Sequence, residues 1–197
     1  MKRKAPKTFG NDVENHWGLV VNSLKKAIRG IIIGGVLFGS ILMNHISVNA
    51  NQSGYREIDY QDGIPEDIRV YCELVGNEYN ISPELLEAIA YNESRFIPTV
   101  KNGKHYGLMQ INVKIHSFRL EEYGFTEDDM FDPYKNLIIA ADYISDLYEN
   151  YADEDEVMLA LYSGNWKAVS NYKEYGFVCS YAQTILNRAE KYKEMHE

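Results

Sequence analysis

The chain has 197 residues, of which 45% are hydrophobic and 25% charged, and its formal net charge is −9. The 147 residues after position 50 carry 13 Lys and Arg against 27 Asp and Glu, a net charge of −14. Proteins that bind nucleic acid present clustered Lys and Arg to the phosphates, so this balance excludes nucleic-acid binding as the default function. A stretch of this length supplies one domain with a proper core and is too short for two ordinary ones.

The first fifty residues have the charge pattern of a segment that directs a protein across or into a membrane. Seven Lys and Arg precede an uncharged apolar run from Gly30 to Met43, and basic residues mark the side that stays in the cytoplasm. The run has the length of a signal-peptide core, and residues 48–50 resemble a small-residue cleavage site. Alternatively, residues 28–48 supply the ~20 residues of an uncleaved anchor helix. Both alternatives place the remainder outside the cytoplasm. The predicted segments are a leader of residues 1–50, a polar linker of residues 51–63 and a domain of residues 64–197.

The most informative stretch of the domain begins with a well-marked helix. Ser82 is suited to cap its N-terminus, and Pro83 fits the first helical position. Leu85, Ile89 and Glu93 are spaced by four, so a carboxyl group continues an apolar stripe at the end of the helix. Partial burial and the negative end of the helix dipole both favour the protonated acid, which is the form that a general acid needs. The alternative is a solvated Glu at a fraying helix end.

Apolar spacing predicts four further helices and no sheet. Asn102-Gly103 is predicted to form a tight turn with positive φ, and the acidic run 127–129 is predicted to be a solvated loop. Asp132 is expected to cap the helix that follows it. The predicted helices are 65–79, 133–151, 157–161 and 177–193.

The cysteines and histidines do not form a recognisable metal motif. Cys72 and Cys179 both follow the leader, so a disulfide and a pair of free, buried thiols remain open alternatives. His105 and His116 stand alone, and we expect each to be a loop or surface residue and not a ligand. The sequence therefore predicts no metal and no cofactor.

Four motifs occur in the order that is found in one enzyme family. They are E-S-R-F-I-P at 93–98 with G-L-M-Q-I-N at 107–112, D-P-Y-K-N at 132–136, Tyr162-Ser163-Gly164, and Y-A-Q-T-I-L at 181–186. In this arrangement the chain resembles the lytic transglycosylases of the soluble-lytic-transglycosylase type over roughly residues 64–192. The resemblance implies an all-α, lysozyme-like domain whose loops form the walls of a substrate cleft.

The resemblance also implies a reaction. Enzymes of this family cleave the β-1,4 bond between N-acetylmuramic acid and N-acetylglucosamine in peptidoglycan. Glu93 would protonate the leaving oxygen and then accept the proton of the muramoyl C6 hydroxyl, which closes a 1,6-anhydro ring. One carboxyl group suffices for this chemistry, whereas ordinary glycoside hydrolysis uses two.

Other positions are implied to contact the glycan strand. Gly107 would let the backbone approach a ligand closely, Met109 would offer an apolar surface, and Gln110 would offer both a donor and an acceptor. Tyr181 would hydrogen-bond Glu93. Ser163 stands where relatives usually have Asn, unless a one-residue gap has moved that Asn, and this difference puts substrate affinity in doubt more than catalysis. The implied substrate-binding residues are Ser94, Gly107, Met109, Gln110, Asn112, Tyr162, Ser163 and Tyr181.

The expected partners follow from this assignment. They are peptidoglycan glycan strands and, through the N-terminal segment, the membrane, with the domain at the outer face of the cytoplasmic membrane or secreted to the cell wall. A cell-envelope secretion or conjugation apparatus is a further candidate partner. Two alternative functions remain open, a hydrolytic muramidase and a weakly active wall-binding module of such an apparatus.

Overall fold

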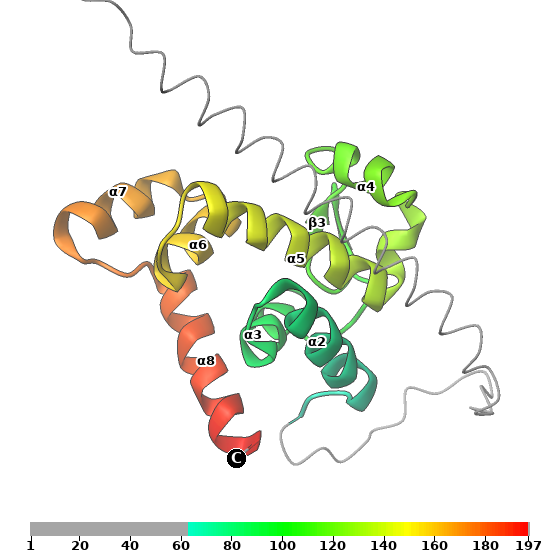
Figure 1. Ribbon diagram of the computed structural model, residues 1–197, viewed down its shortest axis with the longest axis horizontal. Helices are drawn as coiled ribbons and strands as arrows, with labels where there is room; N and C mark the ends of the chain where they lie inside the picture. Colours follow the sequence, from blue (N-terminus) through cyan, green and yellow to red (C-terminus); the bar gives the residue numbers. More distant parts are fainter. Residues whose placement is uncertain (1–62, 197) are drawn as a thin grey trace, which may run out of the picture. The chain divides into compact units, whose positions relative to one another are not determined.

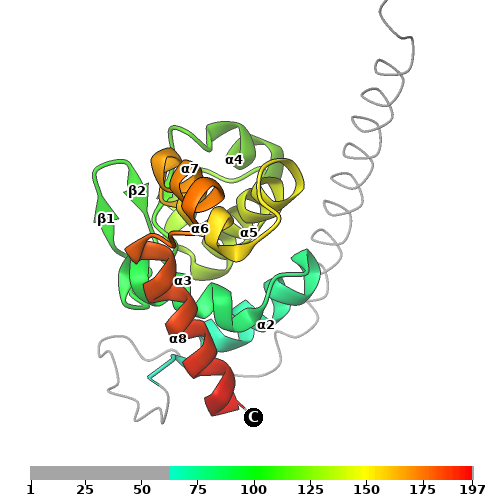
Figure 2. The same ribbon diagram turned by 90° about the vertical axis from the view of Figure 1, so that its left-hand side faces the viewer.

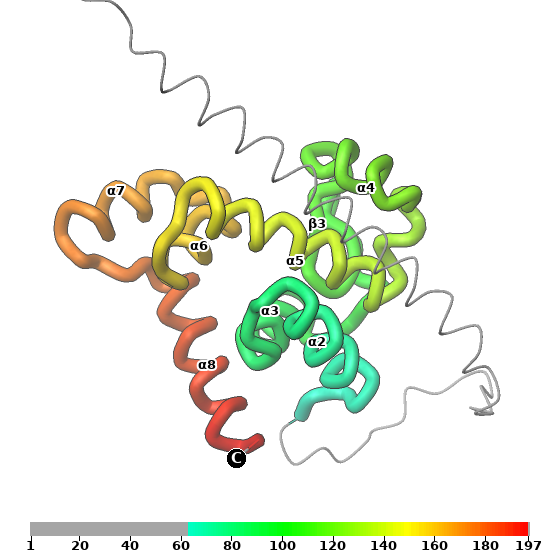
Figure 3. The backbone as a smooth tube through the Cα atoms, viewed as in Figure 1, coloured from blue at the N-terminus to red at the C-terminus, as the bar shows by residue number. Residues whose placement is uncertain are grey.

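The computed structural model describes residues 63–196, and these form a helical domain around a buried apolar core. Figure 1 shows α2 and α3 side by side, with α5 across them and α8 along the far side of α3. The tube in Figure 3 shows α6 and α7 folding back on each other at one end of α5. The helices are α2 (Glu66–Tyr79), α3 (Pro83–Ser94), α4 (Ser117–Tyr123), η1 (Asp128–Phe131), α5 (Pro133–Asn150), α6 (Asp155–Tyr162), α7 (Trp166–Tyr175) and α8 (Ser180–His196).

The two best-marked helices begin where their capping residues predict. The Leu85 N–H donates to Ser82 Oγ at 3.3 Å, with Pro83 at the first position of α3. The Lys135 N–H donates to Asp132 Oδ1 at 3.0 Å at the start of α5. These bonds satisfy backbone donors that have no partner within the helix, so the chain can begin each helix next to the core.

The loop between α3 and α4 contains a small sheet that the sequence analysis did not predict. Strands β1 (Lys101–Asn102), β2 (His105–Tyr106) and β3 (Ile111–Asn112) pair antiparallel in the order β1-β2-β3. The β1–β2 turn includes Gly103 at φ +61°, as predicted. Two-residue strands are too short to show an alternating pattern, which explains why the prediction of no sheet was wrong.

Three helical segments were also missed. The acidic run is not an irregular loop, because Asp128 and Asp129 begin the short helix η1 and Glu127 directly precedes it. Helix α4 has only seven residues, and α7 buries only Ala168 among its ten, so neither has a strong apolar stripe. Both end at a glycine with positive φ, Gly124 and Gly176, which was the available sequence signal.

The predicted N-terminal leader and nearly all of the predicted linker lie outside the described residues. Among the helices of residues 63–196, none combines the length and apolar character that crossing a bilayer requires. This finding concerns the domain and leaves the two alternatives for the leader as predictions.

Candidate active site

Glu93 lies one residue before the C-terminal end of α3 and is half-buried. The chain turns sharply after it, because Arg95 and Phe96 have φ of 56° and 61°, in the left-handed region that non-glycine residues rarely adopt. Strained backbone of this kind costs free energy and often occurs at functional sites. The turn ends the helix directly after Ser94, so the carboxyl group of Glu93 lies at a helix terminus.

Tyr181 holds the carboxyl group of Glu93. Its hydroxyl donates to Glu93 Oε1 at 2.6 Å, so the predicted contact is confirmed. Tyr181 is in the first turn of α8, which packs along α3 (Figure 2). Burial and, after it, the charge of Glu93 raise the pKa of Tyr181, so its hydroxyl remains a donor. The packing of α8 on α3 thus joins residues that are 88 positions apart.

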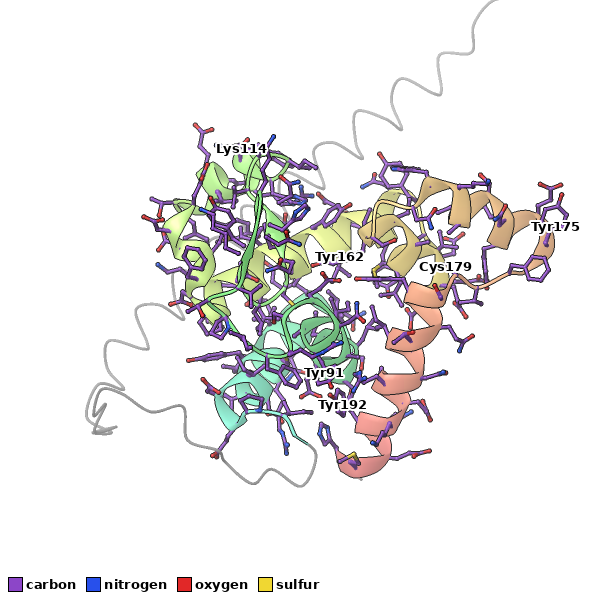
Figure 4. The ribbon with its side chains drawn as sticks, turned by 180° about the vertical axis from the view of Figure 1, so that it is seen from behind. Tyr91, Lys114, Tyr162, Tyr175, Cys179 and Tyr192 are labelled. Atoms are coloured by element: carbon purple, nitrogen blue, oxygen red, sulfur yellow. The ribbon has the colours of Figure 1, made fainter. Side chains whose placement is uncertain are left out.

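Tyr162, at the end of α6, connects Glu93 to the loop that precedes α4. Its hydroxyl donates to the Met109 carbonyl at 2.9 Å. Burial raises the pKa of Tyr162 well above its ordinary value, and the charge of Glu93 is the next cause. Glu93 is therefore close enough to act on this phenol, which Figure 4 labels near the middle of the domain.

Gly107 and Met109 were expected to contact the glycan, but in the structure both pack against the protein itself. A Cβ atom on Gly107, whose φ is +78°, would lie 1.9 Å from the Met130 carbonyl oxygen and 2.5 Å from Asn136 Nδ2. The absence of a side chain is therefore required by the close approach of the protein's own chain. The Met109 side chain is fully buried and offers no surface to a substrate. Its contribution is the backbone carbonyl that Tyr162 binds.

Gln110 offers an acceptor to a ligand and not the expected donor–acceptor pair. Its Nε2 donates to the Val100 carbonyl at 3.2 Å and to the Gly107 carbonyl at 2.9 Å. An amide nitrogen has two hydrogens, and these bonds use both. The oxygen Oε1 is consequently the part of the side chain that is left for a ligand.

Asn136 is a buried residue of this site whose role the sequence analysis missed. Its Oδ1 accepts the Met109 N–H at 2.7 Å, and its Nδ2 donates to the carbonyls of Tyr106 and Met130, both at 2.9 Å. One side chain on α5 thus satisfies three backbone groups of two loops. Asn136 is the last residue of D-P-Y-K-N, so the motif marked the position but not its role.

A groove of about 370 Å³ runs beside Tyr162, between the β3–α4 loop, the middle of α5 and the segment from the end of α6 to the start of α7. It contains four of the predicted substrate-binding residues, and Ile115, His116, Tyr143 and Trp166 line it without having been predicted. None of its lining residues, all within the described chain, is Asp or Glu. Glu93 and Tyr181 lie outside its lining, and the charge of Glu93 acts on Tyr162, which lines it. The predicted residues in the groove are Gln110, Asn112, Tyr162 and Ser163.

The polar side chains of three predicted residues, Ser94, Asn112 and Ser163, form hydrogen bonds to backbone groups close to them in the sequence. Ser94 is buried, and its Oγ donates to the Ala90 carbonyl at 3.1 Å, so the structure does not bring it to the groove. Asn112 Oδ1 accepts the N–H groups of the next turn, at 3.2 and 3.3 Å. Ser163 Oγ donates to the Ala160 carbonyl at 2.8 Å.

Asn165 does not replace the amide that Ser163 lacks. Its Oδ1 accepts the Ala168 N–H at 3.1 Å and caps α7, and Asn165 is not among the residues that line the groove.

His116 lies in the loop that precedes α4, as expected, but it is buried, with 5% of its surface exposed. His105, by contrast, is exposed. Arg119 Nη1 lies 3.5 Å from His116 Nδ1, and the rings of His116 and Tyr143 are 4.5 Å apart. Burial first, and then the charge of Arg119, lower the pKa of His116 to about 4. The ring is therefore neutral at physiological pH.

Both cysteines are free thiols, so the disulfide alternative does not hold in this structure. Cys72 is buried in α2, and burial raises its pKa. Cys179 directly precedes α8 (Figure 4). Within residues 63–196, no three side chains of His, Cys, Asp or Glu gather in a way that would hold a metal ion.

A carboxyl group positioned by a tyrosine beside a groove, in a helical domain, is the arrangement of a lysozyme-like enzyme domain. The sequence profile of the transglycosylase SLT domain matches residues 71–185. The chain belongs to this family, whose members are lysozyme-like, glycan-cleaving enzymes.

Two relatives agree with this assignment. Protein IpgF of Shigella flexneri is 33% identical over 115 residues, which cover 55% of this chain and 68% of the relative. Protein IpgF of Shigella sonnei is 34% identical over 102 residues, which cover 49% of this chain and 60% of the relative.

Proposed function

We propose that this chain is a peptidoglycan lytic transglycosylase that cleaves the β-1,4 bond between N-acetylmuramic acid and N-acetylglucosamine and forms a 1,6-anhydro ring. The observation that carries the proposal is the hydrogen bond from Tyr181 to Glu93 Oε1, beside the groove that Tyr162 lines. It fixes one carboxyl group at the end of α3, and we propose that the glycan strand extends from the groove past Tyr162 to this group. The family membership supplies the substrate class.

The reaction needs two proton transfers at one residue. Glu93, as the acid, donates its proton to the oxygen of the leaving N-acetylglucosamine while the bond from that oxygen to the muramoyl C1 breaks. The Glu93 carboxylate then accepts the proton of the muramoyl C6 hydroxyl as the oxygen of that hydroxyl bonds to C1. No water is consumed, and the enzyme regains its proton. The Tyr181 bond to Oε1 orients the carboxyl group throughout and stabilises its charged form.

The described residues that line the groove supply no second carboxylate. Glycosidases that use water usually place a second carboxylate across the scissile bond, at about 5–9.5 Å from the first. The lining residues of the groove, all described, include no Asp or Glu. A nucleophile supplied by the substrate removes the need for the second carboxylate.

The first test is whether the chain cleaves peptidoglycan at all. Purified walls incubated with the full-length protein are expected to lose turbidity and to release soluble glycan fragments, with heat-denatured protein as the control. Binding to walls without release of fragments would contradict an enzymatic function and would favour the wall-binding module.

Replacing Tyr181 by Phe is expected to lower kcat roughly tenfold or more while KM changes little. A hydrogen bond to a charged group is worth about 1.5–3 kcal/mol, and here it acts on the group that transfers the proton. The ring and its packing remain, so the free energy of unfolding should fall by only about 1 kcal/mol. Steady-state release of fragments and urea denaturation measure the two effects.

Tyr192→Phe is the matched control for Tyr181→Phe. Tyr192 lies on the same helix and is buried, near Tyr91 (Figure 4), and the groups that act on its hydroxyl are Arg188, Tyr91 and Glu87. Loss of its hydroxyl should leave kcat within about twofold. Equal kcat in wild type and Tyr181→Phe would show that Tyr181 is a packing residue.

We further propose that the leader places the domain outside the cytoplasm, by cleavage or by anchoring. The support is the basic segment before the apolar run of residues 30–43. Protease added to intact spheroplasts is expected to digest the domain. Protection equal to that of a cytosolic marker would refute this location.

A further inference from the structure

His116 lies in the groove with one of its ring nitrogens already engaged. Arg119 Nη1 is 3.5 Å from His116 Nδ1. A guanidinium can only donate hydrogen bonds, so Nδ1 must be the acceptor and carries no proton. The proton of a neutral imidazole then resides on Nε2. The contact with Arg119 thus fixes the tautomer as well as the position of the ring.

Arg119 is itself held in place by buried charges. Its Nε donates to Asp142 Oδ2 at 2.8 Å, and its Nη2 forms an ion pair with Asp146. Asp142 also accepts the Tyr123 hydroxyl at 3.0 Å, which is 2.8 Å from the Tyr79 hydroxyl. The network joins α2, α4 and α5, so Arg119 cannot turn away from His116 without leaving two carboxylates unpaired.

The groups that face His116 keep the ring neutral on balance. Burial and the charge of Arg119 lower its pKa to about 4, His105 on β2 lowers it slightly, and only Asp142 raises it. Tyr143, from α5, covers the ring at 4.5 Å and carries no charge at neutral pH. Nε2–H therefore remains a donor across the pH range in which an enzyme of the envelope works.

The structure gives this donor no partner of its own. No described residue accepts a hydrogen bond from His116 Nε2, and His116 forms part of the lining of the groove. In the same groove, Gln110 has used both amide hydrogens and has only Oε1 left. The groove thus contains a group that can only donate and another that can only accept.

An N-acetyl group has the complementary pair. Its carbonyl only accepts and its N–H only donates, whereas a sugar hydroxyl does both and needs no such pairing. His116 Nε2 is not among the fully buried unpaired atoms of the described chain, so a sugar in the groove would be what buries it. A sugar that covers this donor without supplying an acceptor bears the desolvation cost. The exposed Trp166 and Ile115 supply apolar surface in the same groove.

We propose that His116 is a specificity-determining residue, whose Nε2–H donates to the acetamido carbonyl of an N-acetylated sugar in the groove. The inference rests on the proposed function for the class of substrate, and it adds the requirement that this sugar be acetylated. Removal of the acetyl group would leave Nε2–H without an acceptor.

The test compares two substitutions of nearly equal shape. His116→Gln keeps an N–H donor and His116→Met removes it, while both lose the aromatic contact with Tyr143. Each is made in the full-length Glu93→Gln protein, and affinity for the tetrasaccharide of N-acetylglucosamine is measured by calorimetry.

His116→Met is expected to bind roughly two- to tenfold more weakly than His116→Gln, the range that one net hydrogen bond supplies. With the de-N-acetylated tetrasaccharide this advantage of His116→Gln should disappear, and His116→Met should bind at least as tightly, because only the Gln variant then has a donor without an acceptor. Equal affinity of the two for the acetylated tetrasaccharide would overturn the proposal.

The tautomer is tested independently of any variant. Nitrogen-15 spectra of the histidine side chains of the full-length protein are expected to show His116 protonated at Nε2, with this signal shifting when the acetylated tetrasaccharide is added. A proton on Nδ1, or an Nε2 signal that does not respond, would overturn the proposal even if a variant fails to fold.

His196→Gln is the control for the affinity measurements. It removes a histidine elsewhere, on α8, and should leave the affinity for the acetylated tetrasaccharide unchanged.

The two proposals fail in different ways. Suppose that His116→Gln and His116→Met bind the acetylated tetrasaccharide with equal affinity while the wild type still cleaves peptidoglycan. This result refutes only the role of His116. Absence of both tetrasaccharide binding and fragment release in the wild type refutes the proposed function as well.

Discussion

Replacing Glu93 by Gln is expected to lower the release of glycan fragments by at least ~10²–10⁴, the range that general acid–base catalysis contributes. The amide can neither give a full proton to the leaving oxygen nor take one from the C6 hydroxyl, so both steps fail together. Gln has nearly the same volume as Glu, and its oxygen can still accept the Tyr181 hydroxyl. The variant should therefore stay folded and still bind glycan.

The measurement is the rate of fragment release from purified walls, with circular dichroism to confirm equal helicity. Glu84→Gln is the matched control, since Glu84 lies in the first turn of the same helix, where its carboxylate accepts the Ser82 hydroxyl at 2.6 Å. Its rate should stay within about twofold of wild type. A rate for Glu93→Gln near that of the control would show that Glu93 is only a helix-end residue.

Replacing Asn136 by Leu is expected to lower the free energy of unfolding by about 3–5 kcal/mol. The Met109 N–H and the carbonyls of Tyr106 and Met130 would lose a partner at once, and each unsatisfied buried group costs about 1–3 kcal/mol. The loop that carries Gln110 and holds Tyr162 would also lose its attachment to α5. Glycan cleavage per folded molecule should fall as well.

Urea denaturation measures this effect, and Asn150→Leu is its matched control. Asn150 lies at the other end of α5, is exposed, and donates to the Asp146 carbonyl at 2.9 Å within the same helix. Its loss should change stability by about 0.5 kcal/mol or less. A similar small change for Asn136→Leu would mean that the loop does not depend on the buried amide.

Local signals were sufficient to predict where α3 and α5, two of the helices at the site, begin. Ser82 with Pro83, and Asp132 with Pro133, mark helix starts by chemistry that needs no tertiary partner, and both helices begin there. The Tyr181–Glu93 contact spans 88 positions and was predicted from the family resemblance and not from the residues alone. The fold was thus predictable wherever a short stretch contains its own start signal and an apolar stripe.

The missed features depend on contacts that no short stretch encodes. His116 looked isolated because the carboxylates that hold its Arg119 lie 23 and 27 positions beyond that arginine. Gly107 and Met109 were correctly placed in the loop, but the sequence could not show that the glycine faces Met130 or that the methionine enters the core. Such roles are set by what packs against a residue, and that information resides in the tertiary structure.

The central claim is that Glu93 cleaves the glycan strand with the substrate's own C6 hydroxyl as nucleophile. It is tested most directly by digesting purified peptidoglycan in water enriched in the heavy oxygen isotope and measuring the product masses. The account predicts fragments that end in 1,6-anhydro-N-acetylmuramic acid, carry no heavy oxygen, and are absent from the Glu93→Gln digest. Fragments with reducing ends that contain heavy oxygen, or anhydro fragments released equally by Glu93→Gln, would contradict it.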